Sequence, residues 1–130
     1  TMTNLNLSER RILIIDDVED NSLIVADILG FNGAIVASAS NGMDGLALTE
    51  EFQPDIILLD LGMPQMDGYE VIRRLQENPN TADIPAIAMT GFASKEDQAK
   101  VIAAGFSGYM SKPFLSENLI MLIRQILGDD

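Results

Sequence analysis

The stretch Ile12-Leu13-Ile14-Ile15-Asp16-Asp17 decides the fold, because a short apolar run leads directly into a pair of carboxylates. A continuous run of Ile and Leu at this length is typical of a strand buried on both faces, as in parallel sheets. Three later runs repeat the pattern and also end at a residue with a reactive side chain: Ile56–Leu59 before Asp60, Ala86–Met89 before Thr90, and Gly108–Ser111 before Lys112. A further short strand is predicted at Ala34–Ala37.

Helical stretches alternate with these strands. The predicted helices are Asn21–Leu29, Gly42–Glu51, Tyr69–Glu77, Lys95–Ala104 and Glu117–Leu127. N-cap residues mark several of their starts, namely Asp67, Ser94 and Ser116. Glycines are expected to cap their carboxyl ends at Gly30, Gly33 and Gly105.

Strict alternation of short apolar strands with helices predicts an α/β fold, a doubly wound parallel sheet of five strands with helices on both faces. The 130 residues suffice for one domain. We therefore expect a single domain over residues 1–130, with a core at about residues 11–127 and no output domain. In such a sheet, ligands bind at the carboxyl ends of the strands.

Composition limits the function further. Eight Lys and Arg against twenty Asp and Glu give a net charge of −12, which disfavours nucleic acid and anionic membranes as partners. The chain has no cysteine for a disulfide or a thiol nucleophile, and no histidine to act as a phosphorylated or acid–base group. The polar amino end lacks a secretory signal pattern, so a cytoplasmic location is expected.

Asp16, Asp17 and Asp60 are expected to converge at one edge of the sheet. Acidic residues at strand ends are often no more than solvated loop residues, but three carboxylates close together repel one another. A hard cation with oxygen ligands relieves that repulsion, and Mg²⁺ leaves coordination positions open for phosphoryl oxygens. The sequence therefore predicts a magnesium site, which Mn²⁺ can also fill.

Lys112 and Thr90 end strands at the same edge. An ammonium can pair with Asp60 and later with phosphoryl oxygens, and a hydroxyl can donate to such an oxygen. Taken alone, Lys112 would be interpreted as an ordinary surface lysine and Thr90 as a residue that merely ends a strand. Together with a carboxylate nucleophile and a divalent cation, they suit phosphoryl transfer to Asp60.

These residues make the chain resemble the receiver domain of two-component response regulators. The resemblance covers Arg11 to Leu127 and is carried by four motifs in order: Asp16-Asp17, Asp60-Leu61-Gly62-Met63-Pro64-Gln65-Met66-Asp67-Gly68, Thr90-Gly91 and Lys112-Pro113-Phe114. It implies a flavodoxin-like (βα)₅ fold with strand order 2-1-3-4-5, which the chemotaxis regulator of this family exemplifies.

The resemblance also assigns roles. It implies that Asp60 accepts the phosphoryl group, that Asp16 and Asp17 bind Mg²⁺, and that the Gly62 carbonyl is a further ligand. It makes Lys112 the phosphate-binding lysine and Lys112-Pro113 a cis peptide. Thr90 and Tyr109 correspond to the hydroxyl and the aromatic ring of the switch.

A phosphorylation-dependent signalling switch, rather than an enzyme acting on other substrates, is the function implied. The phosphoryl donor would be a histidine kinase or a His phosphotransfer protein. Phosphorylation would shift the face formed by the fourth helix, the fifth strand and the fifth helix toward a state that binds an output protein. On the fifth helix, Met121 points away from the apolar stripe, so it is expected to be exposed and could contact a partner.

Three alternatives remain at this point. A haloacid-dehalogenase-like phosphatase would have a second Asp where Gly62 stands, and a flavodoxin-like FMN carrier would need a Ser/Thr/Gly-rich phosphate loop after the first strand. A degenerate receiver would serve only to bind proteins. Within the receiver interpretation, Gly62 and Phe92 offer no group to hold water near the phosphoryl group, which predicts slow self-dephosphorylation.

Overall fold

The computed structural model describes residues 5–91 and 94–129. The strands are β1 (Arg11–Ile15), β2 (Ile35–Ala39), β3 (Ile56–Asp60), β4 (Ala86–Thr90) and β5 (Gly108–Ser111). The helices are α1 (Glu19–Phe31), α2 (Gly42–Phe52), α3 (Gly68–Glu77), α4 (Lys95–Ala103) and α5 (Ser116–Leu127). Strands and helices alternate throughout, as the sequence predicts.

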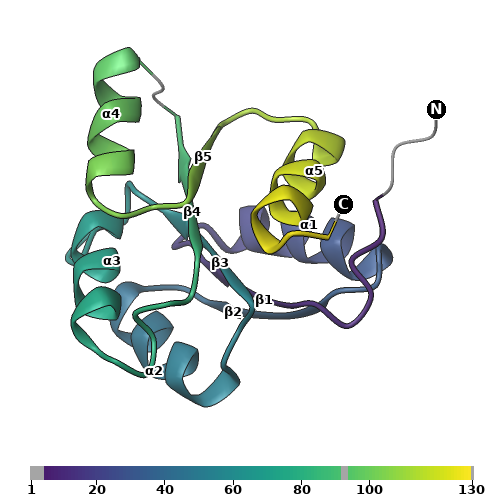
Figure 1. Cartoon of the computed structure of the whole chain (residues 1–130), viewed down its shortest axis with the longest axis horizontal. Coiled ribbons are helices and arrows are strands. Elements are labelled where there is room, and N and C mark those ends of the chain that lie inside the picture. Colours follow the sequence, from purple (N-terminus) through teal and green to yellow (C-terminus); the bar gives the residue numbers. More distant parts are fainter. Residues whose placement is uncertain (1–4, 92–93, 130) are drawn as a thin grey trace.

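The five strands form one parallel sheet in the order β2-β1-β3-β4-β5. Helices α1 and α5 cover one face, and α2, α3 and α4 cover the other (Figure 1). This doubly wound arrangement confirms the predicted fold class and strand order.

Each central strand contributes alternate residues to two apolar layers. Leu13, Ile57 and Ala88 pack toward the α2–α4 side, whereas Ile12 and Leu58 pack toward α1 and α5. Every residue of β3 and β4 is buried, which explains why their sequences are continuous apolar runs without a polar alternation. β2 lies at an edge of the sheet and is much more exposed.

Some predicted boundaries were wrong. Gly30 does not end a helix but lies inside α1, which continues to Phe31. The C-cap is Asn32. The left-handed backbone conformation after the cap occurs at Gly33, where φ is +100°. Ser116 is not an N-cap but the first residue of α5, whose N-cap position is Leu115. The caps at Asp67 and Ser94 are confirmed by bonds from the Glu70 and Asp97 amides.

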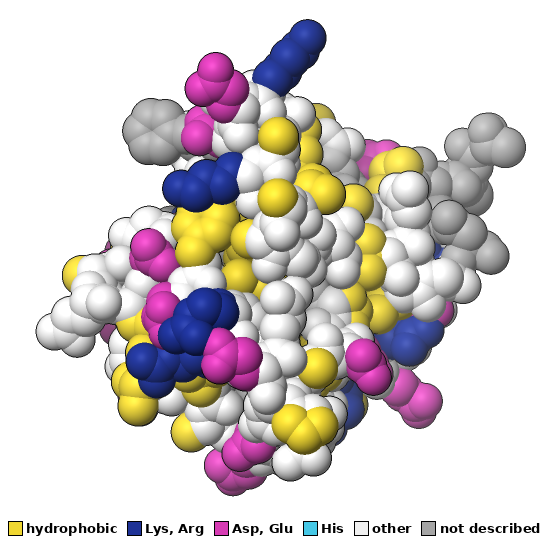
Figure 2. All heavy atoms as spheres, turned by 60° about the vertical axis from the view of Figure 1, so that its left-hand side comes forward, with side chains coloured by type: hydrophobic (Ala, Val, Ile, Leu, Met, Phe, Trp, Pro, Cys, Tyr) yellow, Lys and Arg dark blue, Asp and Glu magenta, His cyan; other side chains and the backbone are white. Residues whose placement is uncertain are grey.

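Positive side chains on the α2–α4 face lie beside negative ones (Figure 2). On α3, Arg73 pairs with Glu70 and Glu77, and Arg74 pairs with Glu70. These surface ion pairs neutralise the arginines locally and contribute little to stability.

Two further features concern exposure. In the described part of the chain, no helix has the length and apolar character that a bilayer crossing requires. Met121 is 45% exposed while Leu119 and Ile123 of the same helix are buried, which confirms the predicted orientation of α5.

Candidate functional site

The carboxyl edge of the sheet brings the reactive residues together. Asp60 is the last residue of β3, Asp16 follows β1 directly, and these two strands are neighbours. Thr90 ends β4, and Lys112 follows β5 directly. β1 lies between β2 and β3, so the strand order changes direction at β1. The site lies at the carboxyl end of the sheet at this switch point, where doubly wound α/β sheets bind ligands.

Three carboxylates form the centre of the site. Oxygens of Asp16, Asp17 and Asp60 all lie within 4.8 Å of one another, close enough to share a metal ion. Asp16 and Asp60 are buried, whereas Asp17 is exposed at the rim. The Val18 amide donates to Asp16 Oδ1 at 2.9 Å, which fixes the Asp16 side chain. An all-oxygen cluster of this kind fits a hard divalent cation such as Mg²⁺.

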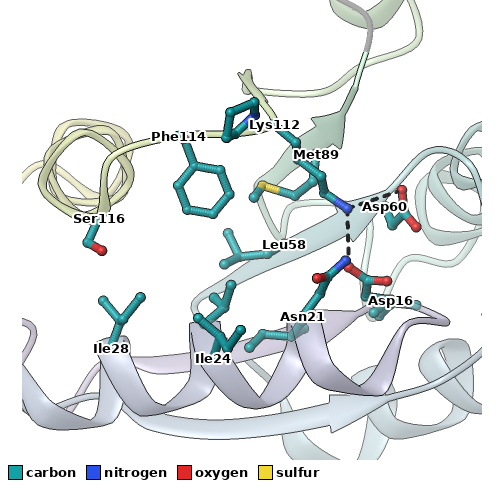
Figure 3. Close-up of a pocket in the computed structure, with 14 residues that line it drawn as sticks. Asp16, Asn21, Ile24, Ile28, Leu58, Asp60, Met89, Lys112, Phe114 and Ser116 are labelled. Carbon is teal, nitrogen blue, oxygen red and sulfur yellow. Dashed lines mark hydrogen bonds and ion pairs between the residues drawn. The ribbon is translucent and has the colours of Figure 1, made fainter.

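Lys112 supplies the positive charge of the site (Figure 3). Its Nζ donates to Asp16 Oδ2 at 3.3 Å and lies 3.8 Å from Asp60 Oδ1. The sequence predicted pairing with Asp60, but Asp16 is the nearer partner. The ammonium therefore sits between two carboxylates and partly neutralises both.

Asp60 has an unfavourable place for a negative charge. Burial raises the pKa of its carboxyl above 3.8, and the neighbouring Asp16 and Asp17 raise it further. The Gly62 amide, which donates to Asp60 Oδ1 at 3.1 Å, and the charge of Lys112 act in the opposite direction. Ionisation of the Asp60 carboxyl in this site therefore carries a cost that a bound cation would reduce.

This pKa shift predicts how stability depends on pH without metal. The pKa of Asp60 is higher in the folded state than in the unfolded chain. Protonation of Asp60 therefore stabilises the folded protein in acid, and this stabilisation is lost as pH rises through the raised pKa. In excess EDTA, Asp60→Asn is therefore expected to melt at a higher temperature than the wild type at pH 7, with the difference narrowing toward pH 4. Thermal melts across this range measure it, with the exposed Asp20→Asn as control. A wild type that is the more stable protein at pH 7 would contradict the prediction.

The remaining predicted residues lie around this centre. Thr90 is buried, and its carbonyl oxygen accepts a hydrogen bond from the Lys112 amide at 2.7 Å. This bond connects the end of β4 to the start of the loop after β5. Tyr109 lies on β5 and is partly buried. The Lys112–Pro113 peptide is cis, the geometry that the resemblance implied. Phe92 lies outside the described residues, so its predicted role stays untested.

Sequence reasoning missed a cleft beside the carboxylates. Its volume is about 510 Å³, and it lies between α1 and the segment after β5. One end of the cleft opens onto Asp16, Asp60 and Lys112 (Figure 3). Its walls are mainly apolar and include Ile24, Ile28, Leu58, Met89 and Phe114. The signal in the sequence was that α1 carries apolar residues on nearly all sides, more than one buried face requires.

Comparison with known proteins identifies the family of the chain. A family model described as the response regulator receiver domain matches residues 12–124. The chain belongs to this family. As a receiver domain it works in phosphorylation-dependent two-component signalling, which favours the receiver interpretation over a haloacid-dehalogenase-like phosphatase or an FMN carrier.

Individual receivers are similar over nearly their whole length. The polar-differentiation response regulator DivK of Brucella anthropi is 33% identical over 120 residues, which cover 92% of this chain and 98% of DivK. The structure of the chemotaxis response regulator CheY4 of Vibrio cholerae is 26% identical, with a TM-score of 0.86 and coverage of 92% and 99%.

A third relative contains a metal. The receiver domain of the sensor histidine kinase PA1611 from Pseudomonas aeruginosa PAO1 is 27% identical, with a TM-score of 0.85 and coverage of 93% of this chain and 99% of that domain. Its structure contains a magnesium ion coordinated in the active-site cleft. Receiver domains are signalling modules that interact with histidine kinases and output partners.

Proposed function

We propose that this receiver accepts a phosphoryl group on Asp60, with Mg²⁺ held by Asp16, Asp17 and Asp60 and by the Gly62 carbonyl. The observation that carries the proposal is the group of three carboxylates within 4.8 Å beside the Lys112 ammonium. The magnesium ion in the PA1611 receiver supports the choice of cation. When bound, the cation would neutralise carboxylate and phosphoryl charge.

The chemistry follows from the side chains. A carboxylate oxygen of Asp60 attacks the phosphorus of a phosphohistidine on the donor protein, the new O–P bond forms, the P–N bond breaks, and the imidazole leaves and takes a proton from solvent. Lys112 exchanges its contacts with Asp16 and Asp60 for a phosphoryl oxygen. The Thr90 hydroxyl donates to another. The chain needs no general base, because the nucleophile is already ionised.

Phosphorylation changes the balance between two states of the signalling face. Thr90 moves toward the phosphoryl group, and Tyr109 turns into the space that Thr90 leaves. The face formed by α4, β5 and α5 then binds an output protein. The exposed side chain of Met121 on α5 is a candidate contact.

We further propose that residues 1–130 act as one domain in the cytoplasm, without turnover of other substrates.

The metal requirement tests this proposal. Acetyl phosphate is expected to phosphorylate the wild type with Mg²⁺, and excess EDTA is expected to abolish the reaction, because neither the carboxylates nor the incoming phosphoryl group is then neutralised. Asp17→Asn is expected to need at least about tenfold more Mg²⁺ for half-maximal phosphorylation. The control Asp20→Asn, an exposed carboxylate on α1, keeps the wild-type requirement. Phosphorylation that is unchanged in EDTA would refute the metal assignment.

The lifetime of the phosphoryl group gives a separate prediction. A Cβ added at Gly62 would lie 3.8 Å from Asp60 Oδ1, with no closer contact, so a side chain can be added beside the acceptor without a clash. Gly62→Asn is expected to shorten the lifetime by about tenfold, because an amide there can orient a water for attack. Gly62→Ala adds the Cβ but no polar group, and it is expected to decay like the wild type. Equal decay of all three proteins would show that Gly62 does not set the lifetime.

A further inference from the structure

We infer that the free edge of β2 binds an extended, basic peptide segment of a partner as a sixth strand of the sheet. This surface lies apart from the carboxylate site, and the inference does not depend on phosphorylation. It rests on the unpaired backbone of β2, on the absence of the usual protection of an edge strand, and on the charge of the two flanking helices.

The outer edge of β2 offers unpaired backbone groups. Among the residues that the structure describes, β2 is a terminal strand of the sheet and pairs only with β1. The Ile35 amide donates to Arg10 O at 2.8 Å, and Ala39 O accepts from the Asp16 amide at 3.1 Å, so these peptide groups face β1. Because peptide direction alternates along a strand, those of Val36 and Ser38 face outward. They provide two donors and two acceptors in the register of an added strand.

The edge lacks the features by which proteins prevent strand addition. Natural edge strands are commonly protected by charged side chains, by proline or by a bulge. From Ala34 to Gly42 the chain contains no charged residue and no proline, and the pairing of β2 with β1 runs without interruption from Ile35 to Ala39. Ile35 at the start of the strand is 47% exposed. An extended chain therefore finds an accessible, partly apolar edge.

The charges around the edge indicate the chemistry of the peptide. Helices α1 and α2 both pack against β2, and they carry six carboxylates and no Lys or Arg: Glu19, Asp20, Asp27, Asp44, Glu50 and Glu51. This composition opposes the addition of a second, equally acidic copy of the chain. It favours a segment with Lys or Arg at the positions that point toward the helices.

Helical spacing directs part of this charge toward the edge. On α2, Met43 and Glu50 contact Arg74 and Asn78 on the α3 side, and Glu51, about a quarter turn further around the helix, lies off that contact and away from the buried face. On α1, Ile24 and Ile28 line the cleft near β5, so Glu19 and Leu23 lie on the other flank. Leu23 is 55% exposed there and provides an apolar contact beside the carboxylates.

A fluorescein-labelled peptide of about eight residues, Lys alternating with Val or Thr, tests the inference by fluorescence anisotropy with the unphosphorylated protein. The wild type is expected to bind this peptide at least about tenfold more tightly than it binds the same peptide with N-methylated backbone amides. Ser38→Pro removes an outward amide that no strand uses, and it is expected to weaken binding by a similar factor, whereas Ser38→Ala retains it. Glu19→Gln with Glu51→Gln is expected to weaken binding at low salt more than the distant control Glu96→Gln.

Amide hydrogen exchange provides a readout that does not depend on the fold of any variant. The peptide is expected to slow exchange at Val36 and Ser38 of the wild type. Equal affinity for the methylated peptide, or unchanged exchange at these amides, would overturn the inference in favour of general attraction to an acidic protein. A wild-type dimer by light scattering that Ser38→Pro converts to a monomer would overturn it in favour of a second copy.

Discussion

Asp60→Asn is expected to abolish phosphorylation by acetyl phosphate or by a phosphohistidine donor, with uptake at least about a hundredfold lower than in the wild type. An amide nitrogen or oxygen has no charge with which to attack phosphorus, and no neighbouring group replaces it. Asp16 is engaged by the Val18 amide and by Lys112, and Asp17 lies at the exposed rim. Incorporation of phosphoryl groups under saturating Mg²⁺ measures the effect.

Asp67→Asn is the matched control for this prediction. Asp67 lies in the same loop between β3 and α3, and its Oδ1 accepts from the Glu70 amide at 2.9 Å as the N-cap of α3. Asparagine caps a helix about as well as aspartate does. This variant is therefore expected to retain both its fold and its phosphorylation. Substantial uptake by Asp60→Asn would mean that another carboxylate is the acceptor.

Gly68→Ala is expected to lower the free energy of unfolding by about 1–3 kcal/mol, because it overpacks the backbone around Asp60. A Cβ at Gly68 would lie 2.8 Å from the Asp60 carbonyl oxygen and 2.9 Å from Leu61 Cα, and these backbone atoms cannot move without displacing the end of β3. The same displacement is expected to reduce the rate of phosphorylation. Urea unfolding curves and uptake of phosphate from acetyl phosphate provide the two measurements.

Gly30→Ala separates this clash from a general effect of alanine. Gly30 lies inside α1, and apart from its chain neighbours and the nearby backbone of its own helix, a Cβ there would have no atom within 4 Å. Alanine at such a helical position is expected to stabilise the protein by up to about 1 kcal/mol. If both variants are as stable as the wild type, the packing described around Gly68 is wrong.

The sequence predicts the sheet well because β1, β3 and β4 are buried on both faces. Burial requires continuous apolar runs, and these are easily recognised. β2 was displaced in the prediction, which placed it at Ala34–Ala37, because Ser38 and Ala39 have little intrinsic preference for strands. Their place in the sheet comes from pairing with Ile14 and Ile15 of β1, a tertiary contact that local composition does not encode.

The sequence predicted which residues form the candidate site, but it did not predict which of them contact one another. Parallel strands bring Asp16 and Asp60 to the same edge, so their proximity follows from topology. That Lys112 lies nearer to Asp16 than to Asp60 depends on the path of the chain after β5 and on side-chain conformation. The cleft beside α1 likewise depends on how Phe114 and the side chains of α1 face each other on the same side of the sheet. Neither follows from spacing in the sequence.

Direct identification of the phosphorylated residue tests whether Asp60 is the phosphoryl acceptor. The wild type is incubated with acetyl phosphate and Mg²⁺, the acyl phosphate is reduced with borohydride, and tandem mass spectrometry locates the resulting homoserine. We expect homoserine at residue 60 alone, and none when EDTA is present during phosphorylation. Homoserine at residue 16 or 17, or equal modification with and without Mg²⁺, would contradict it.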